Sequence, residues 1–386
     1  MSRPDTAPSL AALCRPLLWI PLLITTITAQ MPYNPTRLLY NGSLVYVFQP
    51  SADSSTQFEL GTIDISSNIA ASKLPYTQLY PTLPFLDSKK AQPFDAVLDN
   101  GGNITVYTGD CALGASGGQI WSFVPEPAEK SGKGSWTQDD LAFAQQGKYA
   151  SRMGPNYLSA GMSFSAMVNG NVMSTEAYFF GGMCPFQNED SNEWQSSANY
   201  SNLMVTLEPS RMDVESVSYQ LDVSSSRGPP IAEAGFTLTG LSPLFSNQSD
   251  GTQTQQQNFV LIAGHTSSAF INTSQVALFS LPQQGWTFIP VSQPDTSRTD
   301  LAIRTDVGEI EPRSGHSAVL TADGTRVIIF GGWIGDMNTP AEPQLAVLNI
   351  GDGYGGQGEW KWAVPTTTGS GLPAGSGIYG LSLIHI

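Results

Sequence analysis

The segment PRSGHSAVLTADGTRVIIFGGW, from Pro312 to Trp333, decides the fold of this chain. It reads as a strand, a turn and a second β-rich strand that ends in two glycines. The apolar stretch QLAVLNI (344–350) and the Trp-bearing segment GEWKW (358–362) follow it. Glycine tolerates a positive φ and therefore suits the sharp exit from the second strand. The segment predicts four short strands in succession.

The same order of segments recurs along the chain. Apolar runs that end in glycine are ITVYTGD (104–110), AYFFGGM (177–183) and FVLIAGH (259–265), and apolar stretches follow at 119–125, 202–209 and 275–282. Preceding strands are expected in 159–168 and 229–241. The residues that define the repeat are Gly109, Gly181, Gly182, Gly264, Gly331, Gly332, Trp136, Trp286 and Trp360. A weaker copy opens with LVYVFQP (44–50) as its inner strand and continues with FELGTIDIS (58–66), without the glycine pair or the Trp.

This order of strands, paired glycines and Trp resembles the kelch repeat. The resemblance implies an all-β, kelch-type β-propeller, in which each unit is a four-stranded blade and each Trp packs against the next blade. It covers about residues 38–380 and gives about five blades plus the start of a sixth. The glycine pairs lie farther apart than the about 50 residues of an average kelch repeat, which predicts long loops, for example at 187–202 and 245–258.

The sixth unit breaks off soon after it begins. PAGSGIYG (373–380) resembles the PRSGHSAV that opens the fifth unit, and LSLIHI (381–386) resembles a translated library adapter. We therefore expect a propeller over 30–380 that is incomplete at its C-terminus, followed by a non-native tail. A genuine C-terminus here would instead leave an unpaired sheet edge, which closed propellers avoid.

Residues 1–29 have the order of a signal peptide. Arg3 and Arg15 precede the apolar run 16–28, and Ile27 and Ala29 suit the −3 and −1 positions of a cleavage site. We expect cleavage after Ala29; the alternatives are an uncleaved anchor and a buried strand. The apolar run is too short and too interrupted by proline to span a bilayer comfortably.

Composition excludes a coiled coil and a highly charged disordered chain, and it disfavours nucleic-acid binding. Only 13% of the residues are charged, against about 25% in an average soluble domain, and 38 Gly and 27 Pro favour turns and short strands. A net charge of −15 would repel a phosphate backbone, so nucleic acid is not an expected partner.

Two further features favour export. Five sequons stand in polar or turn-like stretches, at Asn41, Asn103, Asn199, Asn247 and Asn272. Removal of the signal peptide leaves two cysteines, Cys111 and Cys184, each two residues after the terminal glycine of adjacent repeats. Matching loops of neighbouring blades lie close together, which favours a disulfide; the alternative is two free thiols.

Candidate catalytic residues are few. Kelch-type propellers include copper radical oxidases similar to galactose oxidase, which use two His, a Tyr and a Cys-linked Tyr, but the only histidines are His265, His316 and His385. We expect no cofactor, no metal site and a packing or turn role for His316. Tyr107, Phe179, Phe180 and Phe330 are expected in the core, whereas Trp194 and Trp333 are the candidates for exposed aromatic side chains.

The sequence leads to a secreted or cell-surface interaction module, not an enzyme, with a protein or cell-wall glycan as partner. The chain also resembles extracellular kelch proteins of filamentous fungi, whose longer forms carry a membrane helix beyond the propeller. The alternative is a secreted carbohydrate-active enzyme or oxidase on the same fold. An intracellular kelch adaptor is a third hypothesis, which requires the signal peptide and the sequons to be coincidental.

Overall fold

The computed structural model describes residues 33–67, 74–127, 129–145, 147–169, 175–186, 193–213, 216–294, 309–366 and 377–380. The expected signal peptide and the expected non-native tail lie outside the described residues. Within the described ranges, no helix has the length and apolar character needed to cross a membrane.

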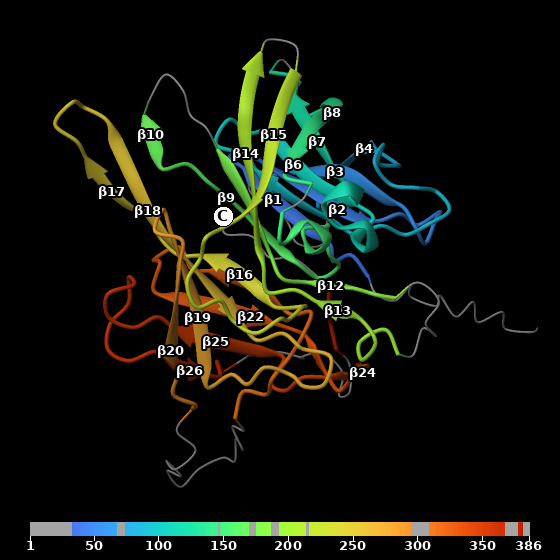
Figure 1. The fold of residues 1–386 in the computed structure, drawn as a ribbon. Coiled ribbons are helices and arrows are strands. Elements are labelled where there is room, and N and C mark those ends of the chain that lie inside the picture. The colour runs from blue at the N-terminus through green and yellow to red at the C-terminus, as the bar shows by residue number, and fades with distance from the viewer. Residues whose placement is uncertain are drawn as a thin grey trace, which may run out of the picture.

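The chain is nearly all-β and consists mainly of antiparallel four-stranded meanders (Figure 1). The first meander contains β1 (Arg37–Asn41), β2 (Leu44–Pro50), β3 (Phe58–Asp64) and β4 (Tyr76–Tyr80). The second contains β5 (Phe94–Leu98), β6 (Ile104–Gly109), β7 (Gly118–Pro125) and β8 (Gly134–Phe143). The third contains β9 (Ala160–Phe164), β11 (Glu176–Phe180), β14 (Met204–Asp213) and β15 (Ser216–Val223).

Two more meanders follow. One contains β16 (Thr237–Gly240), β18 (Gln253–Ile262), β19 (Gln275–Leu281) and β20 (Gly285–Pro290). The other contains β21 (Ser317–Leu320), β22 (Arg326–Phe330), β25 (Leu345–Asn349) and β26 (Lys361–Ala363). Short 3₁₀ helices η1 (Cys111–Gly117) and η2 (Ala150–Arg152) lie in the loops of the second and third meanders.

The remaining strands extend these units. Parallel pairing of β8 with β15 joins the second and third meanders into one eight-stranded sheet. β10 (Met167–Asn169) and β17 (Leu244–Asn247) flank the first half of β18, and Figure 1 shows this hairpin projecting from the body. Two short ribbons follow glycine pairs: β12 (Met183–Cys184) with β13 (Asn199–Tyr200), and β23 (Trp333–Ile334) with β24 (Asp336–Pro340).

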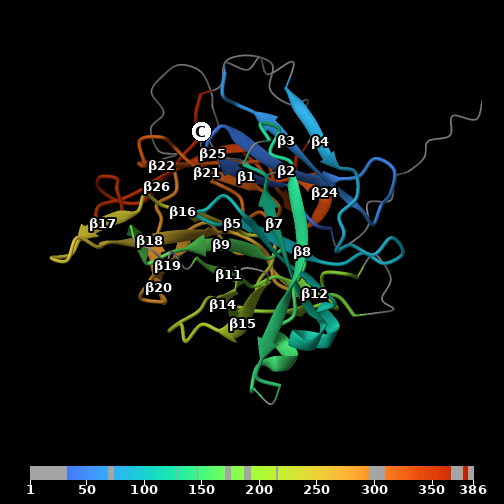
Figure 2. The ribbon, with the colours of Figure 1, turned by 90° about the horizontal axis from the view of Figure 1, so that it is seen from above.

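The meanders are arranged like the blades of a propeller. Their first strands contact one another in sequence order, β1 with β5, β5 with β9, β9 with β16 and β16 with β21, and they gather at the centre of the view in Figure 2. Four apolar clusters fill the spaces between consecutive meanders. The repeat tryptophans contribute as expected, since Trp286 and Trp360 belong to two of these clusters and Trp136 packs against a third.

The structure corrects three details of the strand assignment. In the first unit the innermost strand is β1, and LVYVFQP forms β2, the second strand. The stretch 245–258, expected as a loop, forms most of β17 and the first half of β18. The fourth strand of the third unit, β15, contains no Trp and was not recognised in the sequence.

A run of left-handed residues, here called the left-handed arc, links the starts of successive units. Leu158, Gly235, Gly315 and Gly380 have φ values of 56°, 68°, 66° and 68°. Within the arc, the N–H of each glycine donates to the carbonyl oxygen of the preceding member at 2.8–2.9 Å, and Thr36 N–H donates to Gly380 O at 2.8 Å. These bonds connect four unit starts directly to the start of the chain's first meander.

The similarity between PAGSGIYG and PRSGHSAV extends to geometry at the last described residues. Gly332 N–H donates to Ile378 O at 2.8 Å, as Gly264 N–H donates to Arg313 O at 2.9 Å. Ile378 and Gly380 thus make the contacts that Arg313 and Gly315 make one unit earlier.

Alanine at Gly235 should destabilise the fold more than alanine at Gly228. Both glycines are left-handed, with φ of +68° and +66°, so alanine strains each backbone by about 1–2 kcal/mol. At Gly235 the new Cβ would also lie 2.0 Å from Ser314 Oγ, whereas at Gly228 nothing lies within 4 Å. We expect G235A to lower the free energy of unfolding by about 1–3 kcal/mol more than G228A does, as measured by urea unfolding. Equal costs would show that close packing at the arc is unimportant.

Candidate functional site

The centre of the propeller-like arrangement contains a cavity of about 220 Å³. It is lined by the first strands of the meanders and by the left-handed arc. The polar side chains in its lining come from Arg37, Asp95, Ser159, Thr237 and His316, among others. This cavity is the candidate site because it joins charged and titratable side chains from separate units.

Arg37 and Asp95 form an ion pair that links the first and second meanders. Arg37 Nη2 lies 3.2 Å from Asp95 Oδ2 and donates to Ser159 O at 2.7 Å, which extends the link to the third meander. Ser159 Oγ donates to the same carboxylate at 3.3 Å. Burial raises the pKa of Asp95, and the charge of Arg37 opposes that rise. The pair therefore holds three units together at the axis.

His316 links the fourth and fifth meanders. Its Nε2 lies 2.9 Å from Thr237 Oγ1, and its Nδ1 is buried without a hydrogen-bond partner in the part of the chain that the structure describes. Burial, with a smaller effect from the positive charge of Arg313, lowers the pKa of His316 to about 3. The imidazole is neutral at physiological pH and, as expected from the sequence, has a packing and hydrogen-bonding role.

Two residues that line this cavity each have a buried polar atom with no hydrogen-bond partner among the described residues, Nδ1 of His316 and Nε of Arg37. Unpaired buried polar groups beside a cavity are commonly satisfied by bound water or by a small polar ligand. The cavity could accordingly hold water or a single hydroxyl-bearing group. The cavity offers polar groups for binding. Its carboxylate, that of Asp95, is already engaged in the ion pair with Arg37.

His265 occupies a different environment, an aromatic cluster next to the left-handed arc. The rings of Trp194, Tyr200, Phe270 and Trp333 lie 5.3–5.9 Å from its ring, measured between centroids. Its Nδ1 lies 2.8 Å from Ser314 Oγ, and burial lowers the pKa of His265 to about 4. His265 and His316 therefore bond to separate partners. No group of three or more His, Cys, Asp and Glu suited to a metal occurs in the described ranges.

The expected exposure of Trp194 and Trp333 is wrong. Their side chains are 8% and 0% exposed, because both lie beyond a glycine-pair turn, where the chain folds over the end of the central strands. The expected core positions of Tyr107, Phe179 and Phe180 are confirmed, and Phe330 is half-buried. The most exposed large apolar side chains include Leu244, Ile231 and Leu113 instead.

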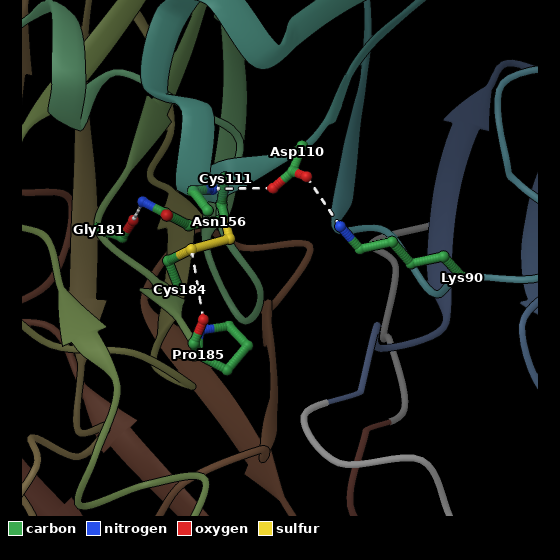
Figure 3. Close-up of a disulfide and its surroundings, with 8 residues drawn as sticks. Lys90, Asp110, Cys111, Asn156, Gly181, Cys184 and Pro185 are labelled. Carbon is green, nitrogen blue, oxygen red and sulfur yellow. Dashed lines mark hydrogen bonds and ion pairs between the residues drawn. A yellow bond between two sulfur atoms is a disulfide. The ribbon is translucent and has the colours of Figure 1, made fainter. Parts of the chain in front are cut away.

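The disulfide between Cys111 and Cys184 is confirmed (Figure 3). It joins η1 of the second unit to β12 of the third, with 5.7 Å between the Cα atoms. Asp110 caps η1 by accepting from Ala112 N–H at 3.0 Å, and Lys90 Nζ donates to Asp110 at 2.8 Å. A disulfide of this kind is typical of an oxidising compartment.

The five sequon asparagines differ in exposure. Asn199, Asn247 and Asn272 are exposed, whereas Asn41 and Asn103 are half-buried. Asn103 Nδ2 donates to Asp99 Oδ2 at 3.0 Å, and the hydroxyl residue of its sequon, Thr105, is only 8% exposed. In contrast, Ser274 N–H and Oγ both donate to Asn272 Oδ1, which leaves the Nδ2 of an exposed side chain unengaged by that turn.

Comparisons with known proteins give no family. No protein-family model matches the chain, and no curated protein matches it. Among solved structures, it is similar to a chain in "Cryo-EM structure of RAG in complex with one melted RSS and one unmelted RSS", with a TM-score of 0.42 and 11% identity over 85% of this chain and 83% of that one. It is also similar to Penicillium chrysogenum alpha-L-arabinanase complexed with arabinobiose, with a TM-score of 0.39 and 10% identity over 87% of this chain and 82% of that one. Both scores are below 0.5, so neither likeness carries an argument here.

Loss of the disulfide should destabilise the protein substantially. The bond closes an interval of 73 residues between two units, and removal of a native disulfide typically costs about 2–5 kcal/mol. We expect the C111S/C184S variant to lose that amount in urea unfolding, and reduced wild-type protein to match it. A decrease in the free energy of unfolding of less than about 1 kcal/mol would contradict a stabilising role for the disulfide.

The difference in stability between wild-type protein and H316Q should depend on pH. The unfolded histidine has a pKa of about 6.5, and the folded value is about 3, so between these values the unfolded state binds the additional proton. The wild-type advantage should therefore shrink on acidification by about 1.4 kcal/mol for each pH unit below 6.5. Chemical unfolding of both proteins from pH 7 to 4.5 measures it. A gap that stays constant would show that His316 charges freely in the folded protein.

Proposed function

We propose that this protein is a secreted or cell-surface, kelch-type β-propeller, with about five blades and the start of a sixth, that binds a protein or a cell-wall glycan without catalysing a reaction. The glycine-pair turns support the kelch type, because Gly181–Gly182 and Gly331–Gly332 all have positive φ and end the second strands of their units. The fungal origin implied by the resemblance belongs to the same proposal.

One observation carries the non-catalytic role. The charged and titratable side chains of the central cavity bond between units, Arg37 with Asp95 and His316 with Thr237. A general base works best with a pKa near the working pH, and the pKa of His316 lies far below it. These groups therefore suit a structural role, which leaves the outer surface as the place for interactions.

The disulfide and the exposed sequons support an extracellular location. Three sequon asparagines lie on the surface of two units, Asn199 in β13 of the third unit, and Asn247 in β17 and Asn272 in the loop before β19 of the fourth. Expression with residues 1–29 in a secreting eukaryotic host tests this location. Secreted protein should begin at Gln30, and the medium should be screened against cell-wall polysaccharides and surface proteins. Bound copper or oxidation of a sugar alcohol would favour the alternative, a secreted oxidase or carbohydrate-active enzyme.

Glycan occupancy should follow the exposure of each asparagine. We expect the exposed Asn199, Asn247 and Asn272 to carry glycans and the half-buried Asn103 to remain unmodified, because its side-chain amide donates to Asp99. Peptide mass spectrometry after enzymatic deglycosylation in heavy-oxygen water identifies each occupied site. The N272Q variant, which should lose the mass of one glycan, is the control. Full occupancy at Asn103 with none at Asn272 would contradict the expectation.

A further inference from the structure

One side-chain position repeats just before the left-handed arc. Asn156 and Arg313 each lie two residues before an arc member, and both donate to the first residue of their own unit's glycine-pair turn. Asn156 Nδ2 donates to Gly181 O at 2.9 Å, and Arg313 Nη1 donates to Gly331 O at 3.0 Å. A side-chain donor at this position, half-buried in Asn156 and buried in Arg313, therefore satisfies the turn carbonyl in two units.

The unit between them has an acid at this position. Glu233 lies two residues before Gly235, and Ala263, with φ of 52°, takes the place of Gly181 and Gly331. Within the described ranges no side chain donates to Ala263 O, and the Oε2 atom of Glu233 is buried without a partner. A carboxylate only accepts hydrogen bonds. When Glu233 is ionised, two acceptors therefore stand where the neighbouring units place a donor.

An adjacent cavity of about 240 Å³ gives access to these two residues. Both Glu233 and Ala263 line it, and its other walls are mainly apolar, from Pro229, Pro230, Ile231 and Phe288 among others. Ile231 is 61% exposed and Phe288 is 44% exposed, so apolar side chains remain open to a partner. An apolar cavity with one buried carboxyl suits a ligand with an aliphatic stem and a cationic end.

We propose that this cavity binds a cationic side chain, Arg or Lys, of a partner protein, with the cation bonded to Glu233 and to the Ala263 carbonyl. The bound group would supply the donor that Arg313 supplies in the next unit. The net charge of −15 favours approach of a basic partner. This inference rests on the proposed interaction function and selects a protein, rather than a glycan, for this surface.

The protonation of Glu233 gives the proposal a distinct signature. Burial alone raises the pKa of Glu233 to about 8, with no contribution from a charged neighbour. His265, which pairs through its backbone with Ala234, has a pKa of about 4 and stays neutral above pH 6. Below pH 8 a cation must displace the carboxyl proton, so its affinity should rise with pH.

Titration of the full chain with n-butylguanidinium tests the proposal by calorimetry from pH 6 to pH 9. The protein should be deglycosylated first, because Asn272 also lines the cavity. We expect one binding site, an affinity that rises by about tenfold for each pH unit below 8, and no binding of n-butanol. E233Q should bind the probe at least tenfold more weakly, whereas E126Q, at an exposed glutamate, should bind normally.

A second variant keeps the test independent of any folding defect in E233Q. E233R would place a guanidinium where Arg313 has one, and it should abolish probe binding while raising Tm. Unsaturable binding to wild-type protein, equal affinity in E233Q, or binding to a folded E233R would each overturn the proposal. The probe needs neither export nor a natural partner, so failure here leaves the interaction function to be judged by the secretion and binding screens.

Discussion

The fold depends on a backbone constraint at its centre, the left-handed arc. The N–H of each arc glycine donates to the carbonyl oxygen of the preceding arc member. The carbonyl oxygen of Gly235 and of Gly315 accepts from the N–H of the next arc member. A φ of about +66° to +68° orients the glycines for these bonds. Glycine adopts that conformation without strain. Leu158 adopts it with a side chain, at a cost that the surrounding packing must offset. The first strands then leave the arc side by side, and the apolar faces of the meanders pack in the spaces between them.

Polar side chains reinforce this centre by bonding between units. Arg37, Asp95 and Ser159 connect three units, and His316 with Thr237 connects two more. Burial that makes such bonds strong also holds histidine neutral, since a charged imidazole loses hydration there. The same physical condition that stabilises the centre therefore removes its most obvious proton acceptor.

Sequence reasoning succeeded where the signal is local. The glycine that ends a second strand and the Trp of a fourth strand recur at definite places, and the two cysteines share one such place, so their pairing followed from the repeat. It failed for Trp194 and Trp333, since their burial depends on an aromatic cluster assembled from several units. It also missed β17, whose Gln- and Thr-containing pairing partner, the first half of β18, lacks the alternation of a half-buried strand. Asp95 and Arg37 had no spacing that distinguished them from solvated charges.

Glu233 stands out when the repeats of this chain are aligned with one another. Asn156, Glu233 and Arg313 occupy one structural position, and among these three only Glu233 makes no hydrogen bond to its turn within the described residues. A repeat that stabilises itself by a buried donor has no structural reason to replace it with a carboxyl, because an unpartnered buried acid costs free energy. In the proposal made above, a partner supplies the donor that this unit lacks, through the cavity that Glu233 and Ala263 line. On this proposal, the departure of one unit from its neighbours marks a binding position on the propeller-like scaffold.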